Sequence, residues 1–287
     1  MRVMLAVALA LAGPAQATEP TDLRKLPFST PTLVSSYGPS AVQFGELRVP
    51  AGKGPFPVAI IYHGGCLLRA VDDTRGTAAI ATALAAKGIA TWNVDYRALG
   101  DEGAGFPGTY LDWGAAADHL RVLARSHPLD LNRVVALGHS AGAPAAAFVG
   151  VRPKLPKDAE IRGADPLPIK AVFAIDGPPD PASLAGLDEK VCGGPIVKRF
   201  LGGTASDQAD RYRLISPATH LPTGVPITMI SSSFVLPLDL ANAYGAKVVA
   251  AGDQATVVQV KGDHFNVIAP GQPQWAEVEA LVLKAFR

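Results

Sequence analysis

The sequence has no excess of charge of either sign. Its 287 residues include 26 Lys and Arg against 25 Asp and Glu, a formal net charge of +1. No basic face and no acidic tail stands out along the chain. Nucleic acids and strongly anionic membrane surfaces attract proteins through clustered positive charge, so we expect neither as a partner.

Long apolar runs are missing beyond the first residues. A membrane-spanning helix needs about 18 or more consecutive apolar residues, and no later segment contains such a run. We therefore expect no membrane span in the mature chain. Hydrophobic residues still make up 48% of the sequence, which is enough for one large core. Because no repeat, low-complexity tract or linker divides the chain, we predict a single domain over residues 18–287.

Cysteine is scarce, with two residues only, Cys66 and Cys192. Neither lies in a C-x-x-C pair or a Cys/His cluster, the patterns that hold zinc. We therefore expect no bound metal.

The first 17 residues have the composition of a signal peptide. Arg2 precedes the apolar run 3–12, Gly13-Pro14 breaks this run, and Ala15-Gln16-Ala17 matches a cleavage site with small residues. A buried first helix is the alternative. We predict export to the periplasm or the exterior, where Cys66 and Cys192 would form a disulfide. A buried, unpaired Cys66 is the alternative reading.

Apolar runs alternate with helical patterns along most of the chain. We predict strands at residues 43–49, 58–62, 89–94, 134–137, 171–175, 227–231 and 255–260. We predict helices at residues 74–87, 111–126, 143–151, 238–251 and 274–286. Such alternation is typical of an α/β fold with a mostly parallel sheet covered by helices on both faces. Residues 18–31 read as an extended lead-in, and residues 177–222 break the rhythm and are the expected cap.

The strongest motif is Gly138-His139-Ser140-Ala141-Gly142, a G-x-S-x-G sequence between a short apolar strand and a helix. A sharp turn at this place exposes the serine side chain, and the flanking glycines allow strand and helix to approach closely. The motif predicts that Ser140 is a nucleophile. An ordinary turn is the alternative.

A second motif, His63-Gly64-Gly65-Cys66, directly follows the predicted strand 58–62. In folds with a G-x-S-x-G turn, this loop supplies one backbone N–H to an oxyanion hole, and the residue after the serine supplies the other. The candidates are Gly65 or Cys66 in the loop, and Ala141 after the serine. We expect His63 to be a structural hydrogen-bonding residue.

The third signal is His264, which follows the last predicted strand and lies after Ser140 in the chain. This order agrees with the sequence Ser, acid, His found in such folds. His264 is the only one of the six histidines in that place, so it is the candidate general base.

Together these segments resemble one branch of the α/β-hydrolase superfamily, the esterases similar to kynurenine formamidase, feruloyl-esterase-like and isoprenylcysteine-methylesterase-like proteins. The segments are Tyr37-Gly38-Pro39, His63-Gly64-Gly65-Cys66, Trp92-Asn93-Val94-Asp95-Tyr96-Arg97, Gly138-His139-Ser140-Ala141-Gly142, Arg211-Tyr212 with Ser216-Pro217, and His264-Phe265. The resemblance implies the α/β-hydrolase fold with a small cap insertion. It also implies hydrolysis of esters or amides by a Ser–His–Asp triad without a cofactor.

The triad acid departs from this pattern. In the family it follows the strand that corresponds to residues 227–231, and the expected position falls here on Ser233 or Phe234. Neither residue is a carboxylate. One candidate is Asp239, which reads equally as a helix-start carboxylate. The other is Asp176, at the end of the predicted strand 171–175.

The carboxyl ends of parallel strands lie on the side of the sheet where ligands bind. We therefore hypothesise that the acid has moved to Asp176. Asp239 and the absence of any acid are the alternatives.

Two functions follow from these residues. The first is an exported serine hydrolase that cleaves a small-molecule carboxylic ester, or a related acyl or amide bond, through an acyl-enzyme. The alternative is a binding protein that keeps the fold but has lost efficient hydrolysis, because the usual Asp is missing.

Overall fold

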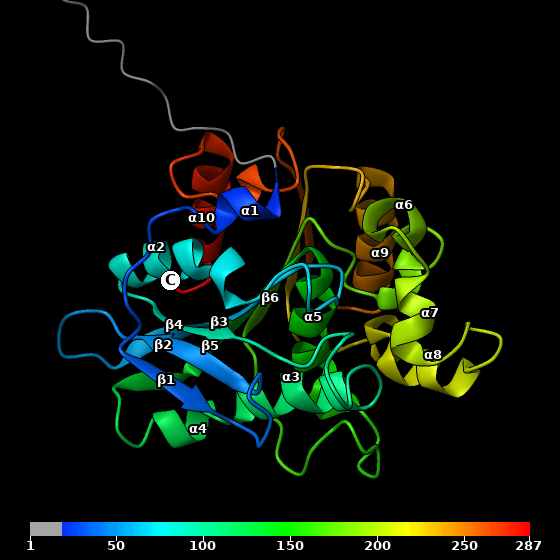
Figure 1. Ribbon diagram of the computed structural model, residues 1–287, viewed down its shortest axis with the longest axis horizontal. Helices are drawn as coiled ribbons and strands as arrows, with labels where there is room; N and C mark the ends of the chain where they lie inside the picture. The colour runs from blue at the N-terminus through cyan, green and yellow to red at the C-terminus, as the bar shows by residue number, and fades with distance from the viewer. Residues whose placement is uncertain (1–18) are drawn as a thin grey trace, which may run out of the picture.

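The computed structural model describes residues 19–287, and its centre is one eight-stranded sheet (Figure 1). The predicted signal peptide, residues 1–17, lies outside the described residues. The strands are β1 (Leu33–Ser36), β2 (Phe44–Arg48), β3 (Phe56–Tyr62), β4 (Ala90–Val94), β5 (Leu129–His139), β6 (Ala171–Ile175), β7 (Ile227–Ser231) and β8 (Ala255–Gln259).

The strand order is β1-β2-β4-β3-β5-β6-β7-β8. The pairs β1–β2 and β2–β4 are antiparallel, and every other neighbouring pair is parallel. This confirms the predicted mostly parallel sheet. The edge strand β1 was not predicted, because its four residues are mostly exposed and carry no apolar alternation.

Helices cover both faces of the sheet, as the alternating pattern predicts. The helices are α1 (Pro20–Leu23), α2 (Ala78–Ala86), α3 (Gly108–Asp118), α4 (Leu120–Leu123), α5 (Ala143–Val151), α6 (Asp188–Cys192), α7 (Ile196–Leu201), α8 (Ala209–Ile215), α9 (Leu238–Ala250) and α10 (Pro273–Lys284). Short 3₁₀ turns lie at Thr74–Gly76, Ser140–Gly142, Arg152–Lys154, Pro181–Leu184, Pro217–His220 and Asn266–Ile268.

Two apolar cores fill the layers between these helices and the two faces of the sheet. One core joins the sheet to α2 and α10, and the other joins it to α3, α4, α5 and α9. In Figure 1, α1, α2 and α10 lie above the sheet, and α3 and α4 lie below it. Strand β3 contributes to both cores, with Val58, Ile60 and Tyr62 in one and Ala59 and Ile61 in the other, which explains its continuous apolar sequence.

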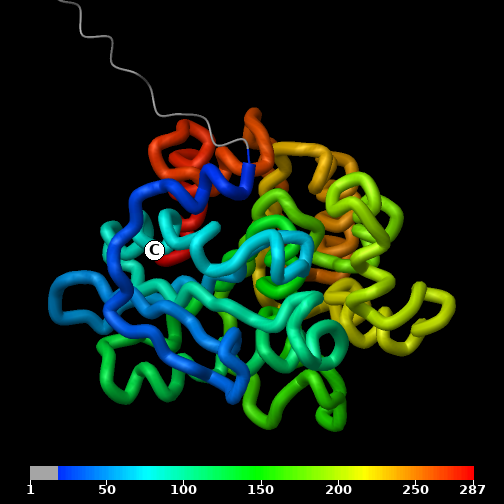
Figure 2. Tube along the Cα trace, viewed as in Figure 1, coloured from blue at the N-terminus to red at the C-terminus, as the bar shows by residue number. Residues whose placement is uncertain are grey.

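The N-terminal lead-in is not extended throughout, contrary to the prediction. Residues Pro20–Leu23 form the short helix α1, and Leu23 is only 2% exposed in the same core as α2 and α10. Proline suits the first turn of a helix. The start of the described chain therefore packs beside its end, as the blue and red parts of the tube show (Figure 2).

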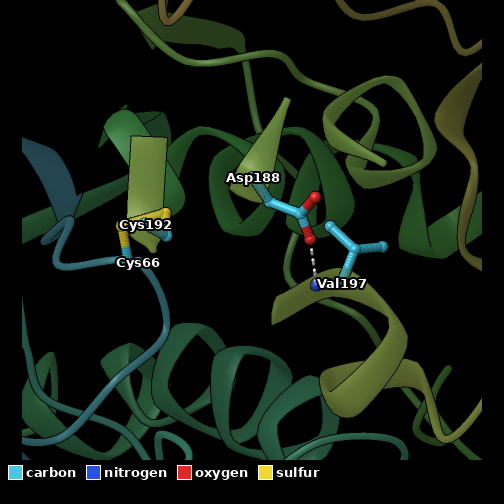
Figure 3. The surroundings of a disulfide bond; sticks show 4 residues. All are labelled: Cys66, Asp188, Cys192 and Val197. Carbon is cyan, nitrogen blue, oxygen red and sulfur yellow. Dashed lines mark hydrogen bonds between the residues drawn. A yellow bond between two sulfur atoms is a disulfide. The ribbon is translucent and has the colours of Figure 1, made fainter. Parts of the chain in front are cut away.

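The segment between β6 and β7 carries α6, α7 and α8, where a cap was expected. The buried carboxylate of Asp188 joins two of these helices (Figure 3). Its Oδ2 accepts a hydrogen bond from the Val197 N–H at 2.8 Å, and its Oδ1 accepts one from the Gly186 N–H at 3.0 Å. Among residues 19–287, no helix combines the length and apolar composition needed to cross a membrane.

The turn after β5 packs directly on the end of β3. A Cβ atom on Gly142 would lie 2.3 Å from the Tyr62 carbonyl oxygen and 2.6 Å from that of His63. Both atoms belong to the backbone, so neither can move aside cheaply. Only glycine fits at this contact.

We therefore predict that Gly142→Ala lowers the free energy of unfolding by about 1–3 kcal/mol, the usual cost of overpacking. Urea denaturation followed by circular dichroism measures this change. The matched control is Gly194→Ala, because a Cβ there meets nothing within 4 Å, and it should change stability by less than about 0.5 kcal/mol. Equal stabilities of the two variants would contradict the close contact.

Candidate active site

Ser140 occupies the turn between β5 and α5 that the G-x-S-x-G motif predicts. Its φ of 54° lies in the left-handed region, which non-glycine residues seldom adopt. Strain of this kind marks a nucleophile elbow, because the turn directs the side chain away from the sheet edge. The start of α5 beneath the turn also favours a developing negative charge.

Asp176 follows β6 directly and is fully buried. Its Oδ2 lies 2.7 Å from Nδ1 of His264, whose side chain is 15% exposed. The carboxylate accepts the hydrogen bond, which places the proton of a neutral His264 on Nδ1 and leaves Nε2 available to accept another. The structure thus brings Asp176 and His264 together, as the hypothesis that the acid has moved to Asp176 predicts.

Two other carboxylates have different surroundings: Asp239, the alternative acid, and Asp263, the neighbour of His264 in sequence. Asp239 is exposed in the first turn of α9. Asp263 adjoins His264 in sequence, but its Oδ1 accepts hydrogen bonds from the backbone N–H groups of Phe265 and Asn266. These hydrogen bonds stabilise its own loop, and Nδ1 of His264 faces Asp176.

The stretch where the family places its acid donates hydrogen bonds to Asp176. The backbone N–H groups of Ser232 and Ser233 lie 2.9 and 3.1 Å from Oδ1, and the Ser233 hydroxyl lies 2.5 Å from Oδ2. Burial alone would raise the pKa of Asp176. The hydrogen bond and charge of His264, together with the Ser233 and Ser232 donors, hold this pKa below its usual value.

His139 supports the His264 loop, a role that sequence reasoning missed. Its Nε2 donates a hydrogen bond to the His264 carbonyl oxygen at 2.8 Å, and the two rings lie 4.6 Å apart between centroids. Burial, helped by the charge of His264, lowers the pKa of His139 to about 3. His139 is therefore neutral near pH 7 and can keep this one donor in place.

The loop after β3 carries the predicted oxyanion donors. Cys66 has a φ of 55°, and the backbone N–H groups of Gly65 and Cys66 donate to no other described residue. Ala141 is the residue after Ser140, in the 3₁₀ turn. These three N–H groups are the available donors beside Ser140 that the sequence indicated.

His63 holds the start of this loop in place through hydrogen bonds and ring stacking, as expected of a structural residue. Its Nε2 lies 3.2 Å from Oδ1 of Asp95, and its ring stacks on Tyr96 at 4.4 Å between centroids. The Tyr96 hydroxyl donates to the His63 carbonyl oxygen at 2.6 Å. Burial alone would lower the pKa of His63, but the hydrogen bond and charge of Asp95 outweigh it and raise this pKa.

Cys66 and Cys192 form a disulfide, with their Cα atoms 5.7 Å apart. The bond joins the oxyanion loop to the last residue of α6 (Figure 3). This is the paired state that an oxidising compartment favours.

These groups meet at one cavity of about 210 Å³, lined by Ser140, His139, His264, Gly65 and Cys66 among others. Within residues 19–287, no three His, Cys, Asp or Glu side chains are grouped as a metal site requires. The arrangement offers a strained serine, a histidine oriented by a buried carboxylate, and unpaired backbone donors. Such a set can add a serine oxygen to a carbonyl group and stabilise the resulting oxyanion.

Comparison with known proteins points to the same chemistry. The BD-FAE family model matches residues 47–233, well over half of the chain. No curated protein matches the sequence.

Solved structures share the fold at low sequence identity, which confirms the predicted α/β-hydrolase fold. A truncated carbohydrate esterase from gut microbiota is 20% identical, with a TM-score of 0.72 over 90% of this chain and 96% of the other. Esterase B from Lactobacillus rhamnosis HN001 is 21% identical, with a TM-score of 0.72 over 92% and 89%. Thermogutta terrifontis esterase 2, solved phosphoramylated by tabun, is 18% identical, with a TM-score of 0.69 over 89% and 93%.

The depressed pKa of Asp176 predicts a pH-dependent contribution to stability. An unfolded Asp has a pKa of about 3.9, so the folded state binds fewer protons than the unfolded state just below that value. The contribution is therefore complete above about pH 5 and is lost as pH falls through the lower, folded-state pKa.

We expect the stability difference between wild type and Asp176→Asn to shrink as pH falls from about 5 to about 2. Urea denaturation at several pH values measures it. Asp239→Asn, which removes an exposed carboxylate, is the matched control, and its difference from wild type should change far less. A constant Asp176→Asn difference over this range would refute the pKa assignment.

Proposed function

The chain belongs to the BD-FAE family, an esterase family of the α/β-hydrolase fold, and from this membership we propose that it is an exported serine ester hydrolase using Ser140, His264 and Asp176. The observation that carries the proposal is the 2.7 Å contact between Asp176 and His264 beside the cavity that Ser140 lines. The membership itself makes the chain an ester hydrolase with a small-molecule ester as substrate.

In the proposed mechanism, Ser140 attacks the acyl carbonyl while Nε2 of His264 takes the hydroxyl proton. His264 then donates this proton to the leaving alcohol, and an acyl-enzyme forms. Water, deprotonated by the same histidine, releases the acid. The Asp176 carboxylate keeps the His264 ring oriented and stabilises its cationic form without taking the proton.

The oxyanion of each tetrahedral intermediate would lie between the backbone N–H of Ala141 and that of Gly65 or Cys66. The Gly65 and Cys66 N–H groups donate to no other described residue. This supports the assignment, because a donor already engaged elsewhere could not stabilise the new charge.

The alternative, a binding protein that has lost hydrolysis, was motivated by the missing acid after β7. Asp176 supplies a carboxylate from the neighbouring strand, and three donors from Ser232 and Ser233 orient it. This arrangement supports a complete triad and favours the hydrolase over the binding protein.

Export is part of the proposal for two reasons. The first 17 residues have the pattern of a signal peptide, and Cys66 and Cys192 are joined by a disulfide of the kind that persists in oxidising compartments. An exported enzyme meets esters outside the cytoplasm, and the carbohydrate esterase among the similar structures makes acylated sugars reasonable first substrates to screen.

An activated serine should react with a neutral fluorophosphonate. We expect intact-mass measurement of the mature protein to show one adduct on wild type and none on Ser140→Ala. Circular dichroism confirms that both proteins are folded. A folded wild-type protein without an adduct would refute the proposed nucleophile and favour the binding protein.

Asp176→Asn should lower kcat on an aryl acetate by about a thousandfold to ten-thousandfold, because the neutral amide can donate to Nδ1 of His264, which favours the wrong tautomer, and no longer stabilises the cationic ring. The matched control, Asp239→Asn, should keep near-wild-type turnover, since this carboxylate is exposed in the first turn of α9. Near-wild-type turnover of Asp176→Asn, or a large loss in Asp239→Asn, would show that the acid is misassigned.

A further inference from the structure

A second buried acidic residue lines the active-site cavity and has no part in the proposed mechanism. Asp72 lines the cavity together with Ser140 and His264, and it is only 7% exposed. It packs directly on the oxyanion loop, because a Cβ placed on Gly65 would lie 2.7 Å from the Asp72 Cβ. Its carboxylate oxygens lie beside Gly76, where a Cβ would be 2.1 Å from Oδ2, so the charge of Asp72 belongs to the wall of the cavity that Ser140 also lines.

One wall of the same cavity comes from the N-terminal helix α1. Glu19, Pro20 and Leu23 line it, although all three precede the family match, which begins at residue 47. The buried Leu23 anchors α1 in the core beneath α2 and α10. On the cap side, Val191 of α6 lines the cavity, next to the disulfide at Cys192.

Arg24 connects this wall to Asp72. Its Nη1 lies 3.3 Å from Oδ1 of Asp72, and its Nη2 lies 2.9 Å from Oδ2 of Asp73. The guanidinium of Arg24 is thus shared between two carboxylates, and its contact with Asp72, which lines the cavity, is the longer one. His63, the other group of potential positive charge that acts on Asp72, is itself hydrogen-bonded to Asp95.

The charged groups around the cavity therefore favour a negative potential. Among the described residues that line it, Glu19 and Asp72 carry carboxylates, and none is Lys or Arg. A cavity with low-dielectric walls concentrates the field of such charges. An anionic ester would meet net repulsion there, whereas a cationic group would be attracted.

We propose that Asp72 is a specificity-determining residue of this hydrolase, and that it selects neutral or cationic esters and excludes anionic ones. Arg24 moderates this selection by partly neutralising Asp72 and by holding α1 against the cavity. The inference rests on the proposed function, because it concerns substrates that react at Ser140.

The test uses three phenyl acetates that differ only in a para substituent: hydroxyethyl, carboxymethyl or trimethylammonioethyl. The same three substituents are also placed on the acyl part of a phenyl ester. In at least one series, the wild-type kcat/KM for the anionic ester should be lower than that for the neutral ester by a factor of about ten or more. A unit charge near the substrate in a partly desolvated site has an effect of this size. The cationic ester should react at least as well as the neutral one.

Two variants should move this ratio in opposite directions. Asp72→Asn keeps the shape of the side chain but removes its charge, so the anionic penalty should fall to within about threefold. Arg24→Met removes the partial neutralisation, so the penalty should grow. The matched control is Asp239→Asn, because Asp239 is exposed in the first turn of α9 and does not line the cavity, and its ratio should stay within about twofold of wild type.

The outcomes separate the inference from the proposed function. If wild type takes the fluorophosphonate adduct and hydrolyses all three esters at equal rates, the charge selection is wrong and the hydrolase stands. If Asp72→Asn keeps the full anionic penalty, Asp72 is not its source and the inference also fails. If wild type neither hydrolyses any ester nor forms the adduct, the proposed function itself fails.

Discussion

The site depends on the close backbone contact of three neighbouring strand ends. The turn after β5 lies against the end of β3 at Gly142, where a Cβ would approach the Tyr62 carbonyl oxygen to 2.3 Å. The residue after Asp176 makes a similar contact, since a Cβ on Gly177 would lie 2.0 Å from the Ser140 carbonyl oxygen. Glycine at these two positions lets the loop after β3, the serine turn and the end of β6 with Asp176 meet at one edge of the sheet.

The position of the proposed acid, Asp176, is explained by this arrangement of parallel strands. Strands β6 and β7 pair in register, with Ile175 opposite Ile230, so their ends lie side by side, about 4.8 Å apart. A carboxylate at the end of either strand can reach a histidine on the loop after β8. The segment after β7 then has a different task, because its serine hydroxyl and backbone N–H groups satisfy the buried carboxylate of Asp176. Without these donors the pKa of the buried Asp176 carboxyl would be higher, because burial raises it and the donors lower it.

Segments outside the sheet line the rest of the cavity at the sheet edge. The disulfide joins the oxyanion loop to the cap at α6, and Arg24 joins α1 to Asp72 and Asp73. Both connections link segments distant in sequence to the loop after β3. The chemistry at Ser140 thus rests on strand ends, whereas the shape and charge of the cavity rest on α1, α6 and Asp72.

The sequence by itself determined the alternating fold and the positions of Ser140 and His264, because strand runs, helix patterns and the elbow motif depend on neighbours along the chain. It also offered Asp176 as one of two acids. Only the tertiary structure brought Asp176 to His264 and left Asp239 exposed on α9, since a contact across 88 residues depends on strand order and not on local pattern. The same holds for His139, Ser233, Asp72 and the helix α1. Their roles arise from packing between segments far apart in sequence. The periodicity of apolar residues along the chain does not predict such contacts.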